Sequence, residues 1–169
     1  VVIHGSYREP RQSTRAASFI TKQLESQGHT VTIVDAKQEN LPMLQTMYKE
    51  YDDGEAPENL EKLAETFKAA DGFVIVAGEY NHSIQPGLKN LLDHFLEEYA
   101  YRPSAIVSYS VGPIAGLRVA MHLRAMLAEL GMSSIPTICS IGTIGDSLNE
   151  DGEDQTEYLT KSATKCINE

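Results

Sequence analysis

The sequence predicts a three-layer α/β/α domain built on a five-stranded parallel sheet. Three observations favour this fold class. The 169 residues are about one domain in size and contain no Pro-, Gly- or Ser-rich linker, so we expect residues 1–169 to form a single domain. Five short runs rich in Val and Ile recur along the chain. Each run is followed by a segment whose apolar residues repeat with the helical period.

The five strand candidates carry almost no charge. Runs of this kind are typical of parallel strands that are buried on both faces of a sheet. They are VVIHG (residues 1–5), TVTIVDA (30–36), GFVIVAG (72–78), PSAIVSYS (103–110) and SSIPTICSIG (133–142).

The five helix candidates each show one apolar face with i, i+3 or i+4, i+7 spacing. Punctuation supports the same division, because Ser13 is suited to cap the first helix, Gly28 and Gly131 to end the first and fourth, and Pro57 and Pro86 to open the second and third. The apolar faces are Ala17, Ile20 and Leu24; Leu60, Leu63 and Phe67; Leu88, Leu92 and Phe95; Ala120, Leu123, Leu127 and Leu130; and Leu159, Ala163 and Cys166.

Strand and helix thus alternate five times. Short right-handed crossovers then give a parallel sheet with helices on both faces, for which the flavodoxin-like strand order 2-1-3-4-5 is expected. The long loop 37–57 is too apolar for a freely solvated connection, so it packs over its own sheet or a subunit partner, or it walls a ligand pocket. The acidic stretch 146–157 is expected to be a solvated loop and helix start.

Composition excludes several classes of protein. Fourteen Lys and Arg against 24 Asp and Glu give a net charge of −10, which disfavours nucleic acids and anionic membranes as partners. No apolar run approaches a membrane span and no signal peptide is apparent, so we expect a soluble, cytoplasmic protein, although the missing initiator Met leaves an upstream segment open. Cys139, Cys166 and the five histidines lack the spacing of metal ligands, so no metal is expected.

Ligands of an open parallel sheet bind at the carboxyl ends of the strands. The loop after the first strand, HGSYREPRQSTR, combines hydroxyl groups with arginines at a helix start, where free N–H groups and the helix dipole favour an anion. It contains neither the Walker pattern nor the G-x-G-x-x-G turn. We therefore predict the seat of a cofactor phosphate at Ser6, Arg8, Arg11, Ser13 and Thr14, with Arg15 completing a local positive pole. The alternative, that the arginines only solvate the helix start, is weakened because they oppose the helix dipole.

Two further loops reach the same edge of the sheet. Polar and aromatic groups after the third strand offer hydrogen bonds and a ring face to a planar heterocycle, and small residues after the fourth strand permit close approach of a flat ring. With the phosphate seat, this is the layout of a site for flavin mononucleotide (FMN). The predicted residues are Glu79, Tyr80, Asn81 and Ser83 in one loop, with His82 as a possible guide for the substrate, and Ser110, Gly112, Ala115 and Gly116 in the other.

Three motifs resemble the NADPH-dependent FMN reductase family. GSYREPR is similar to its GSxRxxR or GSxRxxS phosphate loop, GEYNHSIQPGLKNLLDH to its PEYNxSxPGxLKNxxDW motif, and GPIAGLRVAMHLRAMLAELG to its fourth loop and helix. The chain departs from the family at Gly78, where Pro is usual, at Gln85, which shifts the Pro-Gly pair, at His94 in place of a frequent Trp, and at Ala115 in place of a glycine.

The resemblance implies a homodimeric or tetrameric flavoenzyme. Such an enzyme takes hydride from NADPH or NADH at non-covalently bound FMN and passes electrons to quinones, azo compounds, free flavin or metal oxyanions, so no side chain need be a nucleophile or general base. The alternative is a flavodoxin-type single-electron carrier without its own substrate, which the acidic composition suits; a scaffold without flavin is a third class. Arg118 either points to the cofactor phosphate or contacts a neighbouring subunit.

Overall fold

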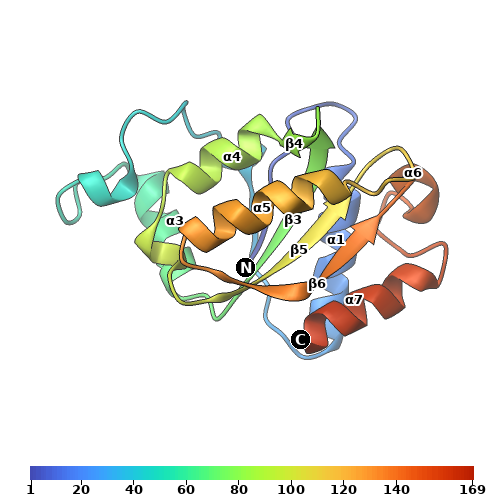
Figure 1. The fold of residues 1–169 in the computed structure, drawn as a ribbon. Coiled ribbons are helices and arrows are strands. Elements are labelled where there is room, and N and C mark those ends of the chain that lie inside the picture. Colours follow the sequence, from blue (N-terminus) through green and yellow to red (C-terminus); the bar gives the residue numbers. More distant parts are fainter.

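The computed structural model describes residues 1–169 and contains the predicted parallel sheet (Figure 1). Its strands follow the order β2-β1-β3-β5-β6, and a short strand, β4, pairs antiparallel with β3. Without β4 the connectivity is 2-1-3-4-5, so the predicted fold class is confirmed. The strands are β1 (Val2–His4), β2 (Ile33–Asp35), β3 (Phe73–Tyr80), β4 (Ser83–Ile84), β5 (Pro103–Tyr109) and β6 (Ser133–Ile141).

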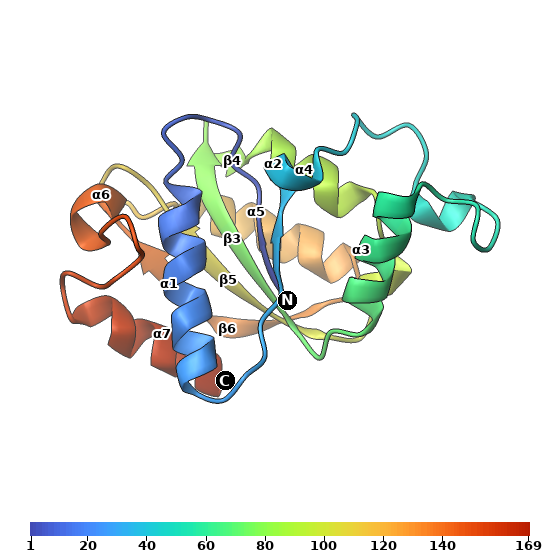
Figure 2. The same ribbon diagram turned by 180° about the vertical axis from the view of Figure 1, so that it is seen from behind.

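Helices cover both faces of the sheet (Figures 1 and 2). The helices α3, α4 and α5 pack on one face, and α1 and α7 pack on the other, each with its own apolar cluster. None of the helices has the length and apolar character needed to cross a bilayer. Their bounds are α1 (Ser13–Ser26), α3 (Glu58–Lys68), α4 (Pro86–Asp93), α5 (Leu117–Glu129) and α7 (Tyr158–Asn168).

The central strands alternate between these two clusters. In β1, Ile3 belongs to the cluster with α3, α4 and α5, whereas Val2 belongs to the cluster with α1 and α7. In β3, Ile75 and Val76 divide in the same way. Successive side chains of a strand point to opposite faces, which explains why these strands read as continuous apolar runs.

The predicted helix ends are mostly confirmed. Gly28 and Gly131 follow α1 and α5 with φ of 89° and 77°, the left-handed conformation that suits a glycine after a helix. Pro86 is the first residue of α4, and Pro57 directly precedes α3. The predicted cap at Ser13 is wrong: Gln12 takes the cap position, without a side-chain hydrogen bond.

Ser13 fails to cap α1 because its side chain is turned into the protein. The residue is fully buried, and its Oγ lies 3.2 Å from Nδ1 of His4 at the end of β1. A hydroxyl group buried at this position needs an internal partner. The histidine supplies one, so Ser13 joins the start of α1 to β1 instead of satisfying the N–H groups of its own helix.

Several short elements escape sequence analysis because they span too few residues to show a period. They connect the main elements or extend a strand end, as β4 does. They are α2 (Ala36–Glu39), α6 (Ile144–Ser147) and the 3₁₀ turns η1 (Tyr48–Glu50) and η2 (Glu97–Tyr99).

The long loop 37–57 lies over its own structure. Tyr48 and Tyr51 pack against the cluster of α3 and α4, while Met43 is 77% exposed. The side-chain amide of Asn90 in α4 holds the loop. Its Nδ2 donates to the carbonyl oxygen of Pro42, and its Oδ1 accepts from the N–H group of Leu44. The geometry thus favours packing of the loop over its own domain and not a role as the wall of a ligand pocket.

The acidic stretch 146–157 is more than a solvated loop, which corrects the expectation. Leu148 is fully buried, and a Cβ on Gly152 would lie 2.6 Å from the carbonyl oxygen of Arg15 in α1. The carboxylate of Asp154 accepts a hydrogen bond from the N–H group of Thr160 in the first turn of α7. The stretch therefore docks onto α1 and caps α7, which its acidic composition concealed.

The turn that joins β5 to α5 is tightly packed at Gly116. This residue has a φ of 68°, and a Cβ there would lie 2.7 Å from the carbonyl oxygen of Tyr109. A Cβ on Gly112, in the same turn, would meet no atom within 4 Å. The two glycines are thus a matched pair, one confined by backbone and the other in open space.

We expect Gly116→Ala to destabilise the protein by at least about 1 to 2 kcal/mol, the cost of a left-handed non-glycine residue, and the close contact adds to it. Gly112→Ala is the control and should change stability by less than about 0.5 kcal/mol. Denaturant unfolding of the apoprotein measures both. Equal stability of the two variants would contradict the packing described for this turn.

Candidate functional site

Three loops meet at the carboxyl edge of the sheet. They are the β1–α1 loop (residues 5–12), the hairpin formed by the end of β3 with β4 (residues 79–84) and the β5–α5 loop (residues 110–116). Figure 2 shows the β1–α1 loop beside the arrowhead of β3, at the end of the sheet away from the N-terminus. We call the edge formed by these three loops the rim.

One side of the β1–α1 loop faces the hairpin. The Oγ of Ser6 lies 3.1 Å from the hydroxyl oxygen of Tyr80, and the guanidinium carbon of Arg8 lies 5.8 Å from the centre of the Tyr80 ring. Arg8 is exposed and forms no ion pair. Its charge is therefore available at the rim.

The other side of the same loop contacts the end of β2 and the start of α2. The hydroxyl group of Tyr7 donates to the carbonyl oxygen of Ala36 at 2.5 Å, and Glu9 forms an ion pair with Lys37. Two residues further, Arg11 donates to both carboxylate oxygens of Asp35, at 2.8 and 2.6 Å.

The polar side chains at the start of α1 bind groups of the protein itself, which differs from the predicted phosphate seat. Thr14 is exposed, and its hydroxyl group donates to the carbonyl oxygen of Arg11 at 2.9 Å. Arg15 donates to the carbonyl oxygen of Leu148 at 2.9 Å and lies 3.7 Å from Glu150, so it holds the acidic stretch 146–157. Of the three arginines in the predicted positive pole, Arg8 alone remains free of an ion pair.

The hairpin is a two-residue turn. Tyr80 pairs with Ser83, and between them Asn81 and His82 have φ of 48° and 67°. Two consecutive left-handed residues are the geometry of a tight β-hairpin turn, and Asn adopts this conformation more readily than most residues. The turn leaves both Asn81 and His82 exposed at the rim.

Two contacts join the hairpin to α5. Arg118 donates to Glu79 through its side chain at 2.8 Å and through its backbone N–H group at 3.2 Å. Burial raises the pKa of Glu79, but the hydrogen bonds and charge of Arg118 outweigh it, so the pKa lies below its usual value. One turn later, Nδ1 of His122 lies 3.1 Å from Oγ of Ser83. The partner of Arg118 is therefore Glu79, a contact that the sequence analysis did not identify.

A buried polar chain lies beneath the hairpin. The N–H group of Gly78 donates to Oε1 of Gln85 at 3.1 Å, and Nε2 of Gln85 donates to the hydroxyl oxygen of Tyr109 at 3.0 Å. Burial is the main reason why the pKa of Tyr109 is raised to about 12, so this hydroxyl group stays protonated. A Cβ on Gly78 would lie 2.7 Å from the Tyr109 ring.

These hydrogen bonds give a common explanation for the departures from the family motif at Gly78 and Gln85. Proline has no N–H group, whereas Gly78 has one that would be buried without a partner if Gln85 were apolar. The ring of Tyr109 in turn leaves no space for a side chain at position 78. The two positions are therefore coupled through one hydrogen bond and one packing contact.

The β5–α5 loop presents fewer groups to the rim than its small residues predict. Gly112 is exposed, and the hydroxyl group of Ser110 donates to its carbonyl oxygen at 2.7 Å. Ala115 and Gly116 are buried, and Gly116 is small because the backbone of Tyr109 approaches it. Close packing within the chain thus explains Gly116 without a ligand.

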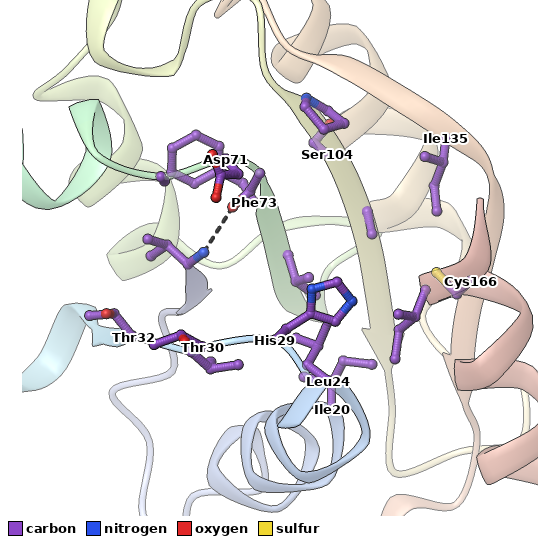
Figure 3. A pocket seen from close by; sticks show the side chains of 18 of the residues that line it. Ile20, Leu24, His29, Thr30, Thr32, Asp71, Phe73, Ser104, Ile135 and Cys166 are labelled. Atoms are coloured by element: carbon purple, nitrogen blue, oxygen red, sulfur yellow. Dashed lines mark hydrogen bonds between the residues drawn. The ribbon is translucent and has the colours of Figure 1, made fainter. Parts of the chain in front are cut away.

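One cavity lies elsewhere, at the amino ends of the strands (Figure 3). Its volume is about 810 Å³, and it is bordered by Leu24, Phe73, Ile135 and Cys166 among others, with none of the predicted site residues. Burial raises the pKa of Cys166 to about 11, so the thiol is protonated and unreactive. No lysine or arginine lines this cavity, whereas Arg8 is available at the rim, so the cavity is the weaker candidate.

The rim fits FMN better than a purely apolar ligand. Arg8 and the first N–H groups of α1 suit a phosphate dianion, and Tyr80 with the exposed backbone of Asn81 and Gly112 suits the edge and face of a planar ring. The loops bring Ser6, Arg8 and Tyr80 together, whereas Arg11 is engaged by Asp35.

Comparisons with known proteins indicate the family of this chain. The sequence profile of the NADPH-dependent FMN reductase family matches residues 1–146. The quinone reductase of Escherichia coli (strain K12) is 42% identical over 78 residues, which are 44% of this chain and 42% of that protein, so the chain spans less than half the length of that relative. The NADPH azoreductase of Bacillus sp. (strain OY1-2) is 29% identical over 158 residues, 91% of this chain and 82% of that protein.

A solved structure supports the fold independently. FerB, a flavoenzyme NAD(P)H:(acceptor) oxidoreductase from Paracoccus denitrificans, is similar with a TM-score of 0.76 and 19% identity, covering 99% of this chain and 93% of its own. At 19% identity this likeness shows that the two proteins share the same arrangement of helices and sheet, and nothing more. The family profile extends from β1 into α6 and includes all three loops of the rim. This chain therefore belongs to the NADPH-dependent FMN reductase family.

Proposed function

We propose that this chain is an FMN-dependent NAD(P)H oxidoreductase, with residues 1–169 forming one FMN-binding domain. The observation that carries the proposal is that Ser6 and Arg8 face Tyr80 across the rim while Arg8 has no competing ion pair. A free cation beside a helix start is suited to a phosphate group. Family membership, with relatives named quinone reductase and NADPH azoreductase, supports the same function.

The three loops would divide the binding of FMN between them. The β1–α1 loop and the start of α1 would hold the phosphate, each charge-assisted hydrogen bond contributing about 1.5 to 3 kcal/mol. The hairpin and the β5–α5 loop would hold the ring system. The proposed contacts are Ser6, Arg8 and Thr14 for the phosphate, and Glu79, Tyr80, Asn81, Ser83, Ser110 and Gly112 for the rest, with buried Ser13, Ala115 and Gly116 supporting the loops from beneath.

Bound FMN would supply the redox chemistry, accepting hydride from NADPH or NADH and passing electrons to a small acceptor. The side chains would bind and orient. Glu79 is held in place by Arg118, so the carboxylate is fixed in position rather than free to act as a general base. His82 is exposed at the tip of the hairpin and is the residue we propose to guide a substrate. Quinones, azo compounds, free flavin and metal oxyanions are the acceptor classes proposed.

A homodimer or tetramer is proposed from the apolar face of α5 and the turn before it. Leu117 and Met121 of α5 are 46% and 52% exposed and, at i, i+4 spacing, lie on one face of the helix, and Ile114 in the loop before α5 is 49% exposed. Val111, 79% exposed, lies in the same loop. Apolar groups gathered on one surface favour a protein partner, and a second copy is the simplest one.

The second candidate is a single-electron carrier, which the net charge of −10 favours because such carriers dock to partners by charge. The two candidates differ in their reaction with NAD(P)H. An oxidoreductase oxidises it directly, whereas a carrier needs a separate reductase.

We expect the purified protein, loaded with FMN, to oxidise NADPH or NADH when a quinone is present, because the rim leaves the ring accessible to small molecules. The loss of absorbance of the reduced nicotinamide gives the rate. The apoprotein without added FMN is the control. Stoichiometric binding of FMN without oxidation of either nucleotide would favour the carrier, and failure to bind FMN would exclude both candidates.

We expect Arg8→Ala to weaken FMN binding roughly 10- to 150-fold, the equivalent of about 1.5 to 3 kcal/mol for one charge-assisted contact. Riboflavin, which lacks the phosphate, should bind the variant and the unchanged protein alike. Fluorescence titration of each flavin measures the two affinities. An equal loss for FMN and riboflavin would mean that Arg8 does not bind the phosphate.

A further inference from the structure

The β1–α1 loop has two sides with different tasks, and the inference drawn from them rests on the proposed function. Ser6 and Arg8 face the hairpin, whereas Tyr7, Glu9 and Arg11 contact the end of β2 and the start of α2. Residues 8–10 form a bend, so the division of the loop into two sides rests on these contacts and not on a regular backbone alternation. Because one short loop carries both sets of contacts, anchoring one set restricts the orientation of the other.

Arg11 makes the strongest of the anchoring contacts. Its two terminal nitrogens donate to both oxygens of Asp35, and the side chains are only 11% and 5% exposed. Paired donation of this kind fixes geometry as well as charge. The hydrogen bonds with Asp35 raise the pKa of Arg11. Burial raises the pKa of Asp35, but the contacts with Arg11 and His4 outweigh burial, so the pKa of Asp35 lies below its usual value.

Asp35 is itself held from several directions. It accepts the N–H group of Lys37 at 3.0 Å, and Nε2 of His4 lies 3.7 Å away. The carboxylate therefore occupies a fixed position at the end of β2, 24 residues from Arg11 in sequence. The charge of Arg11 is therefore balanced and both of its terminal nitrogens are engaged, while its buried Nε has no partner.

We propose that Asp35 is a positioning residue for the phosphate seat and that Arg11 is an anchor of the loop, not a ligand of the phosphate. By holding Arg11 against β2, Asp35 keeps the loop in the orientation that turns Ser6 and Arg8 toward Tyr80. This revises the role that the sequence predicts for Arg11, as one of five residues on the phosphate. The phosphate then depends on Arg8 as its principal side-chain cation.

A competing arrangement makes the opposite prediction. If Arg11 swings from Asp35 to the phosphate when FMN binds, the carboxylate competes with the cofactor for the same guanidinium. Removing the carboxylate charge would then strengthen FMN binding. If Asp35 positions the loop, removing that charge weakens FMN binding. The sign of one affinity change separates the two.

The decisive variant is Asp35→Asn, which keeps the size of the side chain and removes its charge. Affinities for FMN and riboflavin are measured by fluorescence titration of folded protein, well below the unfolding temperature. We expect FMN binding to weaken about 5- to 20-fold and riboflavin binding to change less than twofold. A purely structural role would leave both affinities of the folded protein unchanged.

Tyr7→Phe gives a second measurement that involves no charge. It removes only the hydrogen bond to Ala36 on the anchoring side and keeps the ring. We expect FMN binding to weaken about two- to fivefold, with riboflavin again nearly unaffected. If Asp35→Asn fails to fold, Tyr7→Phe provides the test in its place.

Arg11→Ala, measured alone and combined with Asp35→Asn, completes a double-mutant cycle. The double variant should bind FMN about as weakly as Asp35→Asn alone, because both changes release the same anchor. Unchanged or tighter FMN binding by Asp35→Asn, or by Tyr7→Phe where the former does not fold, would overturn the proposal while leaving the FMN function intact. Failure of the unchanged protein to bind FMN would overturn both.

Discussion

The carboxyl ends of β1, β3 and β5 must stay close together for three short loops to form one rim, and close packing enforces this. A Cβ on Gly5 would lie 2.3 Å from the Cα of Leu88, and a Cβ on Gly87 would lie 2.3 Å from the ring of Tyr7. The β1–α1 loop therefore rests directly on the start of α4. Beneath the hairpin, Gln85 joins the ends of β3 and β5 by hydrogen bonds. The rim is thus preorganised before any ligand arrives.

Charge pairing decides what this rim can bind. The chain as a whole carries a net charge of −10, so long-range electrostatics do not attract a phosphate. Locally, the carboxylate of Glu79 is balanced by Arg118 and that of Asp35 by Arg11, which leaves Arg8 as the unpaired cation facing Tyr80. Short-range pairing of two acidic groups therefore creates a positive site on an acidic protein.

Sequence reasoning predicted the sheet order, the five main helices and the rim, because apolar periodicity and strand ends are local patterns. It could not identify the partner of Arg11, since Asp35 lies in another strand and pairing depends on three-dimensional distance. It assigned Ser13 to a cap because the residue type fits one, whereas burial beside His4 decided otherwise. The hairpin escaped prediction because β4 has two residues and its turn lacks the Asn-Gly pair that usually marks one.

The most direct test of the central claim is a crystal structure of the protein with FMN bound. The phosphate should lie between Arg8 and the start of α1, the ring should lie between the hairpin and the β5–α5 loop, and Arg11 should remain on Asp35. FMN bound in the 810 Å³ cavity at the amino ends of the strands would contradict the site. A phosphate held by Arg11, with Asp35 released, would contradict the division of the loop into a binding side and an anchoring side.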